Sequence, residues 1–278
     1  MTTTLTPTNP NVVAFDPHRF QTAAEHYVRG RLDYPRELIE RVVSLTGLRD
    51  HHRVLDLGWG PGFLAVSFAP YAREVVGIDP EPEMLEQAAK YAAQHGAQVK
   101  FVPGSSYELG DHLGQFQLVT MGRSFHWMDR AATLESLSHI VAEHGAIALF
   151  ADLHLELPAN GWRKRFQSIL EPFAEKDSAH AARHNNPAWL PHEAILLDSQ
   201  FSDLQRISVI RKIKTPIERL LDRALSMSTT SPQRLGSEQE RMLGTLRTAL
   251  NEYAVAGEIT EVVESHALLA FRRNAVNR

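Results

Sequence analysis

The stretch VLDLGWGPGF, residues 54–63, decides how the rest of the chain is interpreted. It begins as an apolar strand and then places glycines at alternate positions, Gly58, Gly60 and Gly62. A strand that runs into a glycine loop and then a helix lets the backbone approach a ligand closely. Trp59 stands between two of these glycines, so the loop carries the bulkiest side chain where that ligand would lie.

Strands and helices alternate around this loop. Apolar runs predict five strands, with the sequences RVLDLG, EVVGID, QVKFVPG, FQLVTMG and AIALFAD. Apolar residues at helical spacing predict helices over about 63–69 and about 81–95, and a third that carries Leu134, Leu137, Ile140 and Val141 and ends at Gly145. This alternation predicts an α/β fold with a doubly wound, mostly parallel sheet, whose ligands bind beyond the carboxyl ends of the strands.

The alternation stops after Asp152. The sequence then predicts a helix near 162–174, a polar stretch, the strand-like LQRISVIRKIKT, a helix in PIERLLDRALSMS, a polar helix over about 237–255 and the β-rich GEITEVVESHALLAFRR. We expect the two late strands to pair as an antiparallel edge, which gives a seven-stranded sheet with an antiparallel last strand and a helical insert or cap.

This pattern predicts one domain over residues 15–278 after a flexible tail over residues 1–14. The domain would have lead-in helices over 15–47, a core over 48–152, a cap or insert over about 153–200, and C-terminal strands and helices over 201–278.

Composition narrows the class of protein. With 29 Lys and Arg against 33 Asp and Glu, the formal charge is −4, which disfavours a nucleic-acid partner. The chain has no Cys, which fits a reducing cytoplasm. Its first residues lack the pattern of a secretory signal, and no apolar run approaches the ~18 residues of a membrane span. We therefore expect a cytoplasmic protein without a membrane partner, whose oligomeric state the sequence does not set.

The glycine spacing separates two classes of cofactor. The dinucleotide fingerprint is G-x-G-x-x-G, and here the third glycine comes one residue too early for it. With Asp56 in front, the pattern D-x-G-x-G-x-G resembles the loop of class I S-adenosylmethionine (SAM) methyltransferases. Asp79 ends the second strand about 20 residues later, where a carboxylate accepts hydrogen bonds from ribose hydroxyls.

The resemblance extends beyond the loop. AAEHYVRGRLDYPRELIERV resembles the lead-in helix of the small-molecule group of these enzymes, GRSFHWMD resembles their S-x-H-W-x-D stretch, and EHGAIALF resembles their fifth strand. The resemblance covers about residues 20–152, and residues 153–200 match nothing specific. It implies a SAM-dependent methyltransferase that releases S-adenosylhomocysteine and acts on a small-molecule acceptor.

Carried over position by position, the resemblance implies a cofactor site. Its residues are Tyr27, Arg31, Gly58, Trp59, Gly60, Gly62, Asp79, Pro80, Met84, Ser105, Ser106 and Arg123. The glycines would line SAM, Asp79 would take the ribose, and Pro80 and Met84 would lie near the adenine. Tyr27 and Arg31 would lie by the methionine carboxylate, with a helix-surface aromatic and a solvated cation as the alternative.

The chain departs from the family at two of these positions. After the third strand the family has G-D-A, whose Asp meets the adenine amino group, whereas this chain has GSSYEL with the uncharged Ser105. Trp59 replaces a residue that is usually small. We favour an indole packed into the core, which requires a small neighbouring residue. The alternative is an indole that narrows the cofactor pocket.

Methyl transfer depends mainly on alignment, and a base is needed only where the acceptor must lose a proton. His126, after the fourth strand, is the candidate catalytic base. The alternative is that His126 and Trp127 form a wall of the pocket. We assign Trp127, Trp162 and Phe166 to acceptor binding, with core packing as the alternative for Trp127.

His180 and His184 are spaced i, i+4, as metal ligands on a helix are, but the pattern places no acidic third ligand. We therefore expect no metal site and interpret this segment as a polar surface.

The leading hypothesis is a SAM-dependent methyltransferase for a small molecule, with O-methylation slightly favoured over N- or C-methylation. The alternative is a protein with the SAM fold that transfers no methyl group, because Trp59 and Ser105 depart from the family pattern. An RNA or protein methyltransferase is disfavoured by the net charge and by the absence of N-P-P-Y after the fourth strand.

Overall fold

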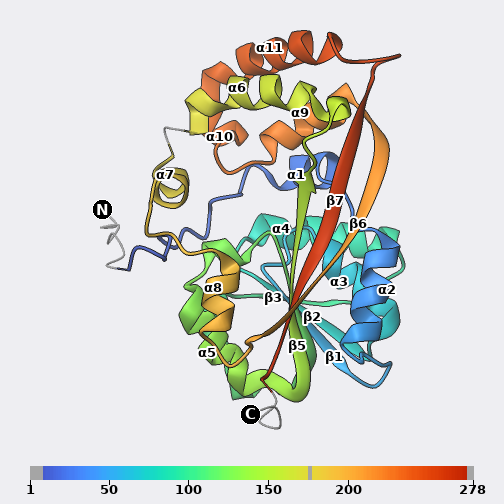
Figure 1. The fold of residues 1–278 in the computed structure, drawn as a ribbon, viewed down its shortest axis with the longest axis vertical. Helices are drawn as coiled ribbons and strands as arrows, with labels where there is room; N and C mark the ends of the chain where they lie inside the picture. The colour runs from blue at the N-terminus through green and yellow to red at the C-terminus, as the bar shows by residue number, and fades with distance from the viewer. Residues whose placement is uncertain (1–8, 175–176, 274–278) are drawn as a thin grey trace.

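One sheet of seven strands forms the centre of the fold (Figure 1). The computed structural model describes residues 9–174 and 177–273. The strands are β1 (Arg53–Leu57), β2 (Glu74–Asp79), β3 (Lys100–Pro103), β4 (Phe116–Gly122), β5 (Val141–His154), β6 (Asp203–Pro216) and β7 (Glu258–Phe271). Their order is β3-β2-β1-β4-β5-β7-β6, and β7 runs antiparallel to both of its neighbours. The predicted mostly parallel sheet with an antiparallel last strand is confirmed.

Helices cover both faces of this sheet. The α-helices of the described residues are α1 (Ala24–Gly30), α2 (Arg36–Leu45), α3 (Phe63–Phe68), α4 (Pro82–Gln94), α5 (Arg130–Ile140), α6 (Trp162–Ala174), α7 (Ser178–His184), α8 (His192–Leu197), α9 (Ile217–Leu225), α10 (Pro232–Leu235) and α11 (Gln239–Asn251). Helices α2 and α3 pack on one face of the sheet over a first hydrophobic core. Helices α5 and α8 pack on the other face over a second hydrophobic core. Successive side chains of a strand point to opposite faces, so Val54 joins the first core and Leu55 the second.

The helix predicted to end at Gly145 ends earlier. Helix α5 stops at Ile140, and Val141 is the first residue of β5, where it pairs with Phe116. Gly145 does not end a helix. It lets the backbone of β5 come close to that of β4, because a Cβ at this position would lie 2.9 Å from the carbonyl oxygen of Gln117. The apolar stripe therefore continued across a helix–strand boundary that periodicity alone does not mark.

A second helical layer lies at the far end of β5, β6 and β7 (Figure 1). Its core joins α6 with α9, α10 and α11, through residues such as Phe166, Leu220 and Leu246. The sequence predicted a cap over about residues 153–200. The observed cap also includes the helices α9, α10 and α11 from the C-terminal region. Conversely, α8 of the predicted insert packs on the main sheet, with Leu196 in its core.

The segment from residue 9 to residue 14 differs from the predicted flexible tail. Val13 is buried, and the side chain of Asn11 accepts a hydrogen bond of 2.7 Å from the backbone N–H of Leu190. The expectation is therefore wrong for this part of the segment, and residues 1–8 lie outside the described residues.

A buried ion cluster joins the cap to the sheet. Glu261 on β7 is fully buried and accepts two hydrogen bonds, of 2.7 and 3.1 Å, from the guanidinium of Arg223 on α9. It also accepts the hydroxyl hydrogen bond of Thr215 on β6 and lies 2.7 Å from Nε2 of His154 on β5. These partners hold the pKa of Glu261 well below its ordinary range, despite its burial.

We expect Glu261→Gln to lower the free energy of unfolding by about 3–5 kcal/mol, because it leaves the buried Arg223 charge without a carboxylate. Urea unfolding followed by circular dichroism measures the loss. Glu264→Gln on the same strand is the control, since the half-buried Glu264 forms no ion pair within the described residues and substitutions away from such pairs cost about 0.5 kcal/mol. Equal losses in the two variants would show that the cluster does not hold the cap.

Candidate active site

The loop after β1 is fixed by hydrogen bonds that the acidic residue Asp56 of β1 accepts. Asp56 accepts from the hydroxyl of Thr120 on β4 at 2.9 Å and from the backbone N–H of Ala65 in α3 at 3.0 Å. Burial raises the pKa of Asp56 to about 7. Asp56 thus ties the strand, its neighbour and the following helix together, and the loop between them is held in one conformation.

The three glycines of the loop have positive φ angles, of 69° at Gly58, 53° at Gly60 and 87° at Gly62. A Cβ at Gly58 would lie 2.5 Å from the Cβ of Ser124. The backbone of the glycine loop and the segment that follows β4 therefore come close together here. A Cβ at Gly60 would meet no atom within 4 Å among the described residues and would project into open space. The loop therefore presents bare backbone to a ligand at Gly60.

Asp79 at the end of β2 faces the same space. One carboxylate oxygen accepts from the backbone N–H of Gly60 at 2.9 Å, and the other from that of Glu81 at 3.0 Å. Burial raises the pKa of Asp79 to about 6, so it is mostly ionised at pH 7. An oriented, ionised carboxylate beside a glycine loop suits a ligand with neighbouring hydroxyl groups.

The loop and Asp79 border a cavity of about 400 Å³, called here the first cavity. Most residues of the predicted cofactor site line it, namely Tyr27, Arg31, Gly58, Trp59, Gly60, Asp79, Pro80, Met84, Ser105, Ser106 and Arg123. Gly62 does not line it but is the N-cap of α3. Trp127, predicted to bind the acceptor, lies on this cavity too, and the guanidinium carbons of Arg19 and Arg183 lie 4.6 and 4.9 Å from the centre of its ring.

The indole of Trp59 packs against β2. It is 4% exposed, and a Cβ at Gly77 would lie only 2.1 Å from its Cε3 atom. Its ring also meets Phe101 edge-on at 4.4 Å. Gly77 is thus the small neighbour that a packed indole requires. Trp59 still borders the first cavity, and its Nε1 has no hydrogen-bond partner within the described residues.

Two other predicted contacts have defined local partners. The hydroxyl of Ser105 accepts from the backbone N–H of Tyr107 at 3.3 Å, as part of the cap of a short 3₁₀ turn, Ser106–Glu108. Nε of Arg31 donates to the hydroxyl of Ser226 at 2.8 Å. Arg31 is therefore held toward the cavities and is not the solvated cation of the alternative interpretation.

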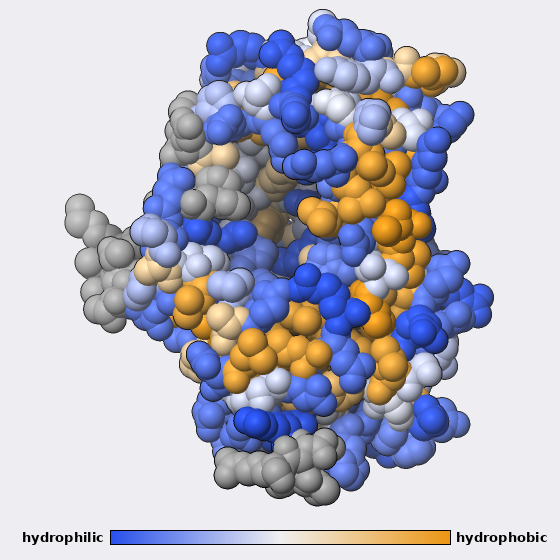
Figure 2. Space-filling view, in the orientation of Figure 1, coloured by the Kyte–Doolittle hydropathy of each residue, from blue (hydrophilic) through white to orange (hydrophobic). Residues whose placement is uncertain are grey.

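A second cavity of about 810 Å³ lies between the sheet and the cap. Figure 2 shows the surface hollowed between the upper helices and the lower part of the molecule, with hydrophilic residues along much of the rim. Trp162 and Phe166, predicted to bind the acceptor, line this cavity. The two cavities meet at residues that line both, which are Arg31, Arg123, Ser124, His126, Met227 and Thr229.

Two histidines lie near this junction. His126 is in the 3₁₀ turn after β4, and its ring stacks at 6.4 Å and 20° on that of His192 at the start of α8. Burial and the neighbouring Arg130 lower the pKa of His192 to about 4, so it is neutral at pH 7. Because a guanidinium always donates, Nδ1 of His192 accepts from Arg130 at 3.2 Å and its proton is on Nε2.

Sequence reasoning missed two parts of the site. Met227 and Thr229 follow α9, far beyond the fifth-strand motif that ends at Phe150, and no local pattern marks them. Asp152 ends the predicted fifth strand and forms an ion pair with Arg123 at the junction. Its position beyond a carboxyl end was the signal that could have found it.

Residues 54–145 match a protein-family model described as "Methyltransferase domain". The chain is therefore similar to methyltransferase domains over these residues. It is 28% identical over 132 residues to the uncharacterized methyltransferase YcgJ of Bacillus subtilis, covering 47% of this chain and 52% of that one. It is 33% identical over 119 residues to the ubiquinone biosynthesis O-methyltransferase of Aromatoleum aromaticum, covering 42% and 47%.

Solved structures share this fold. A SAM-dependent methyltransferase from Geobacter sulfurreducens in complex with S-adenosylhomocysteine superposes with a TM-score of 0.54 at 16% identity, over 93% of this chain and 99% of that one. The YcgJ crystal structure gives 0.53 at 20%, over 87% and 100%. The chain spans about half the length of the curated relatives it matches, so these matches carry over a domain and a fold, not an acceptor.

Among the described residues, no group of three or more acidic or histidine side chains is arranged to hold a metal ion. The side chains of His180 and His184 lie outside the described part of the chain. No helix within that part is long and apolar enough to cross a membrane.

We expect Gly77→Ala to destabilise the fold by about 1–3 kcal/mol, because the added methyl group overlaps the indole of Trp59. Urea denaturation measures this cost in the wild type and in a Trp59→Ala background. In that background the cost should fall to that of an ordinary strand substitution. A cost that is the same in both backgrounds would mean that the indole does not occupy this space.

Proposed function

We propose that the chain is a methyltransferase that transfers the methyl group of SAM to a small-molecule acceptor. The observation that carries the proposal is the pair of cavities that meet at the end of β4, one bordered by the glycine loop and Asp79 and the other roofed by the cap. SAM in the first cavity and an acceptor in the second would meet at residues that both cavities share.

The residues of the first cavity fit SAM. Gly60 leaves open space for a ligand against the backbone, and Asp79 offers an oriented carboxylate to the ribose hydroxyls. Two buried polar atoms on the cavity wall, Nε1 of Trp59 and Oε2 of Glu81, have no hydrogen-bond partner within residues 9–174 and 177–273. A purine with several donors and acceptors offers partners to both.

Bound SAM supplies the activated methyl group, and the chain supplies position and a dry environment. Asp79 would orient the ribose, while Arg31 and Tyr27 would hold the methionine end next to the junction. Ser124 and His126 line both cavities and would border the space between SAM and the acceptor. His126 is the candidate to accept a proton from an acceptor hydroxyl, and His192, neutral with its proton on Nε2, is a candidate hydrogen-bond donor.

O-methylation is the favoured reaction, supported by the likeness to an O-methyltransferase of Aromatoleum aromaticum and by a histidine at the junction. The alternative is a protein that binds SAM without transferring its methyl group. Trp59 on the wall of the first cavity is the observation that keeps this alternative open.

Calorimetry with SAM and S-adenosylhomocysteine tests the cofactor. We expect Asp79→Asn to weaken S-adenosylhomocysteine binding about 10- to 100-fold, because the ribose hydroxyls lose a charged acceptor. Asp111→Asn, on an exposed turn, is the control. Transfer of a tritiated methyl group from SAM to added acceptors then separates the two candidate functions. Absence of binding to both compounds at millimolar concentration would refute the proposal.

Cofactor binding should depend on pH through Asp79, whose pKa burial raises to about 6. Ribose hydroxyls donate to the ionised carboxylate, so affinity is highest above pH 6 and falls as protonation removes that form, by up to about tenfold per pH unit. Calorimetric titrations from pH 8 to pH 5 measure this fall. Asp79→Asn should flatten the part of the profile that Asp79 causes, and an unchanged profile in that variant would assign it to another group.

A further inference from the structure

The wall of the second cavity is largely apolar. Side chains from β4, β5, α6 and β7 form it, among them Met121, Leu149, Trp162, Phe166 and Leu268. A cavity of about 810 Å³ is within the range of sites for small organic molecules. An acceptor that fills it therefore presents an apolar body to this wall.

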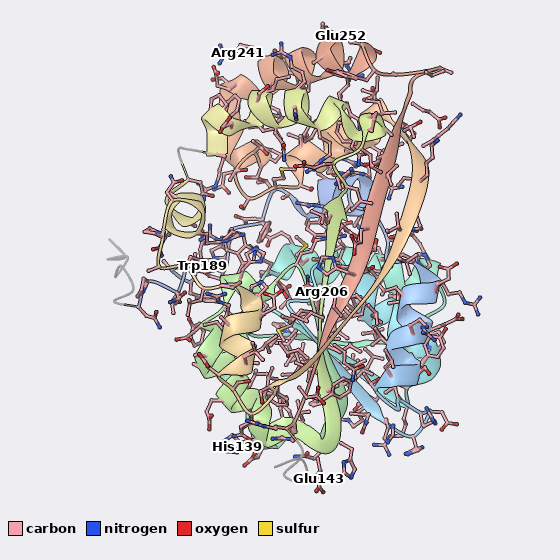
Figure 3. All side chains as sticks on the ribbon, in the orientation of Figure 1. His139, Glu143, Trp189, Arg206, Arg241 and Glu252 are labelled. Atoms are coloured by element: carbon pink, nitrogen blue, oxygen red, sulfur yellow. The ribbon has the colours of Figure 1, made fainter. Side chains whose placement is uncertain are left out.

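The charged residues of the same cavity are mostly basic. Its lining includes the cations Arg31, Arg123, Arg163, Lys164, Arg206 and Arg223, and the acids Asp152, Glu171 and Glu193. Three cations have acidic partners: Arg123 with Asp152, Arg206 with Glu193, and Arg223 with Glu261 behind the wall. Figure 3 labels Arg206 near the centre of the molecule.

Arg163 is the cation of this wall whose charge is least compensated. It lies in the first turn of α6, half-buried beside Trp162. Within residues 9–174 and 177–273 its guanidinium has no hydrogen-bond or ion-pair partner. Burial and the nearby Arg223 lower the pKa of Arg163, while Glu261 raises it. The net effect disfavours the charged guanidinium, and an added anion would stabilise that charge.

Arg31 does not offer the same opportunity. Its guanidinium bonds to Ser226 and lies 5.1 Å from the ring centre of Tyr27 at the junction, where the methionine end of SAM is proposed to bind. Lys164, next to Arg163, is exposed, and an exposed ammonium is compensated by water. Arg163 is therefore the cation available to the far end of an acceptor.

From this arrangement we infer the class of the acceptor, an inference that rests on the proposed function. We propose that the acceptor is an amphipathic carboxylic acid, with its carboxylate on Arg163 and its apolar body along Trp162 and Phe166. A guanidinium matches a carboxylate with two parallel hydrogen bonds. One uncompensated cation matches a monoanion, which favours a carboxylate over a phosphate monoester with its charge near −2.

Calorimetry on protein saturated with S-adenosylhomocysteine tests this assignment. The probes are octanoate, decanoate, dodecanoate and 4-hydroxycinnamate, each compared with its primary amide. We expect at least one acid to bind about tenfold or more tightly than its amide. Arg163→Met should weaken that acid about 10- to 100-fold and leave the amide unchanged, and Arg163→Lys should retain part of the difference.

Arg165→Met is the matched control, because Arg165 is exposed on the same helix and does not line the cavity. Equal binding of acids and amides, equal effects of the two methionine variants, or no binding of any acid would overturn the assignment. Tighter binding of decyl phosphate than of decanoate would overturn the choice of a carboxylate. Loss of S-adenosylhomocysteine binding is a separate outcome, which refutes the proposed function itself.

Discussion

The carboxylate of Glu261 is the interaction on which the upper half of the molecule depends. Strands β5, β6 and β7 extend past the rest of the sheet, and at their far end each contributes one member of the cluster, His154, Thr215 and Glu261. Arg223 on α9 donates to Glu261 and so links the cap to these strands. Because the charges are buried, the cluster tolerates little displacement of any partner, so cap and strands keep a fixed relation. The roof of the second cavity is held in place by this buried pairing.

The two cavities differ in the charged residues that line them. In the first, acidic residues dominate the part near the loop, where Asp56, Asp79 and Glu81 all have pKa values raised by burial. In the second, basic residues outnumber acids. The ribose and purine of SAM would lie on the acidic side, while the acceptor proposed here is an anion on the basic side. The excess of basic residues in the second cavity gives that cavity a preference for an anionic acceptor before the acceptor binds.

The sequence predicted the lower half of the molecule well and the upper half poorly, for a physical reason. Around the loop, local rules act within short distances: glycines at positive φ, Asp79 at a strand end and apolar residues at regular spacing. The cap instead assembles α6 with α9 and α11, whose contacting residues Phe166, Leu220 and Leu246 are far apart in the chain. Residues such as Thr229 reach the site only through that assembly, and no short-range pattern encodes it.

Trp59 shows how an unusual residue is accommodated without changing the loop. The indole takes the space that a side chain at position 77 would fill, and glycine there leaves the backbone of β2 free for it. The pair must therefore change together, since a larger residue at 77 or a smaller one at 59 leaves overlap or a void. Packing accounts for the ring but not for its N–H, which is buried on the cavity wall without a partner in the described residues. A buried donor left unpaired costs about 1–3 kcal/mol, so a ligand that offers it an acceptor gains that amount. Trp59 is thus both a packed core residue and a wall of the cofactor site, and on this argument its indole favours a bound purine rather than excluding one.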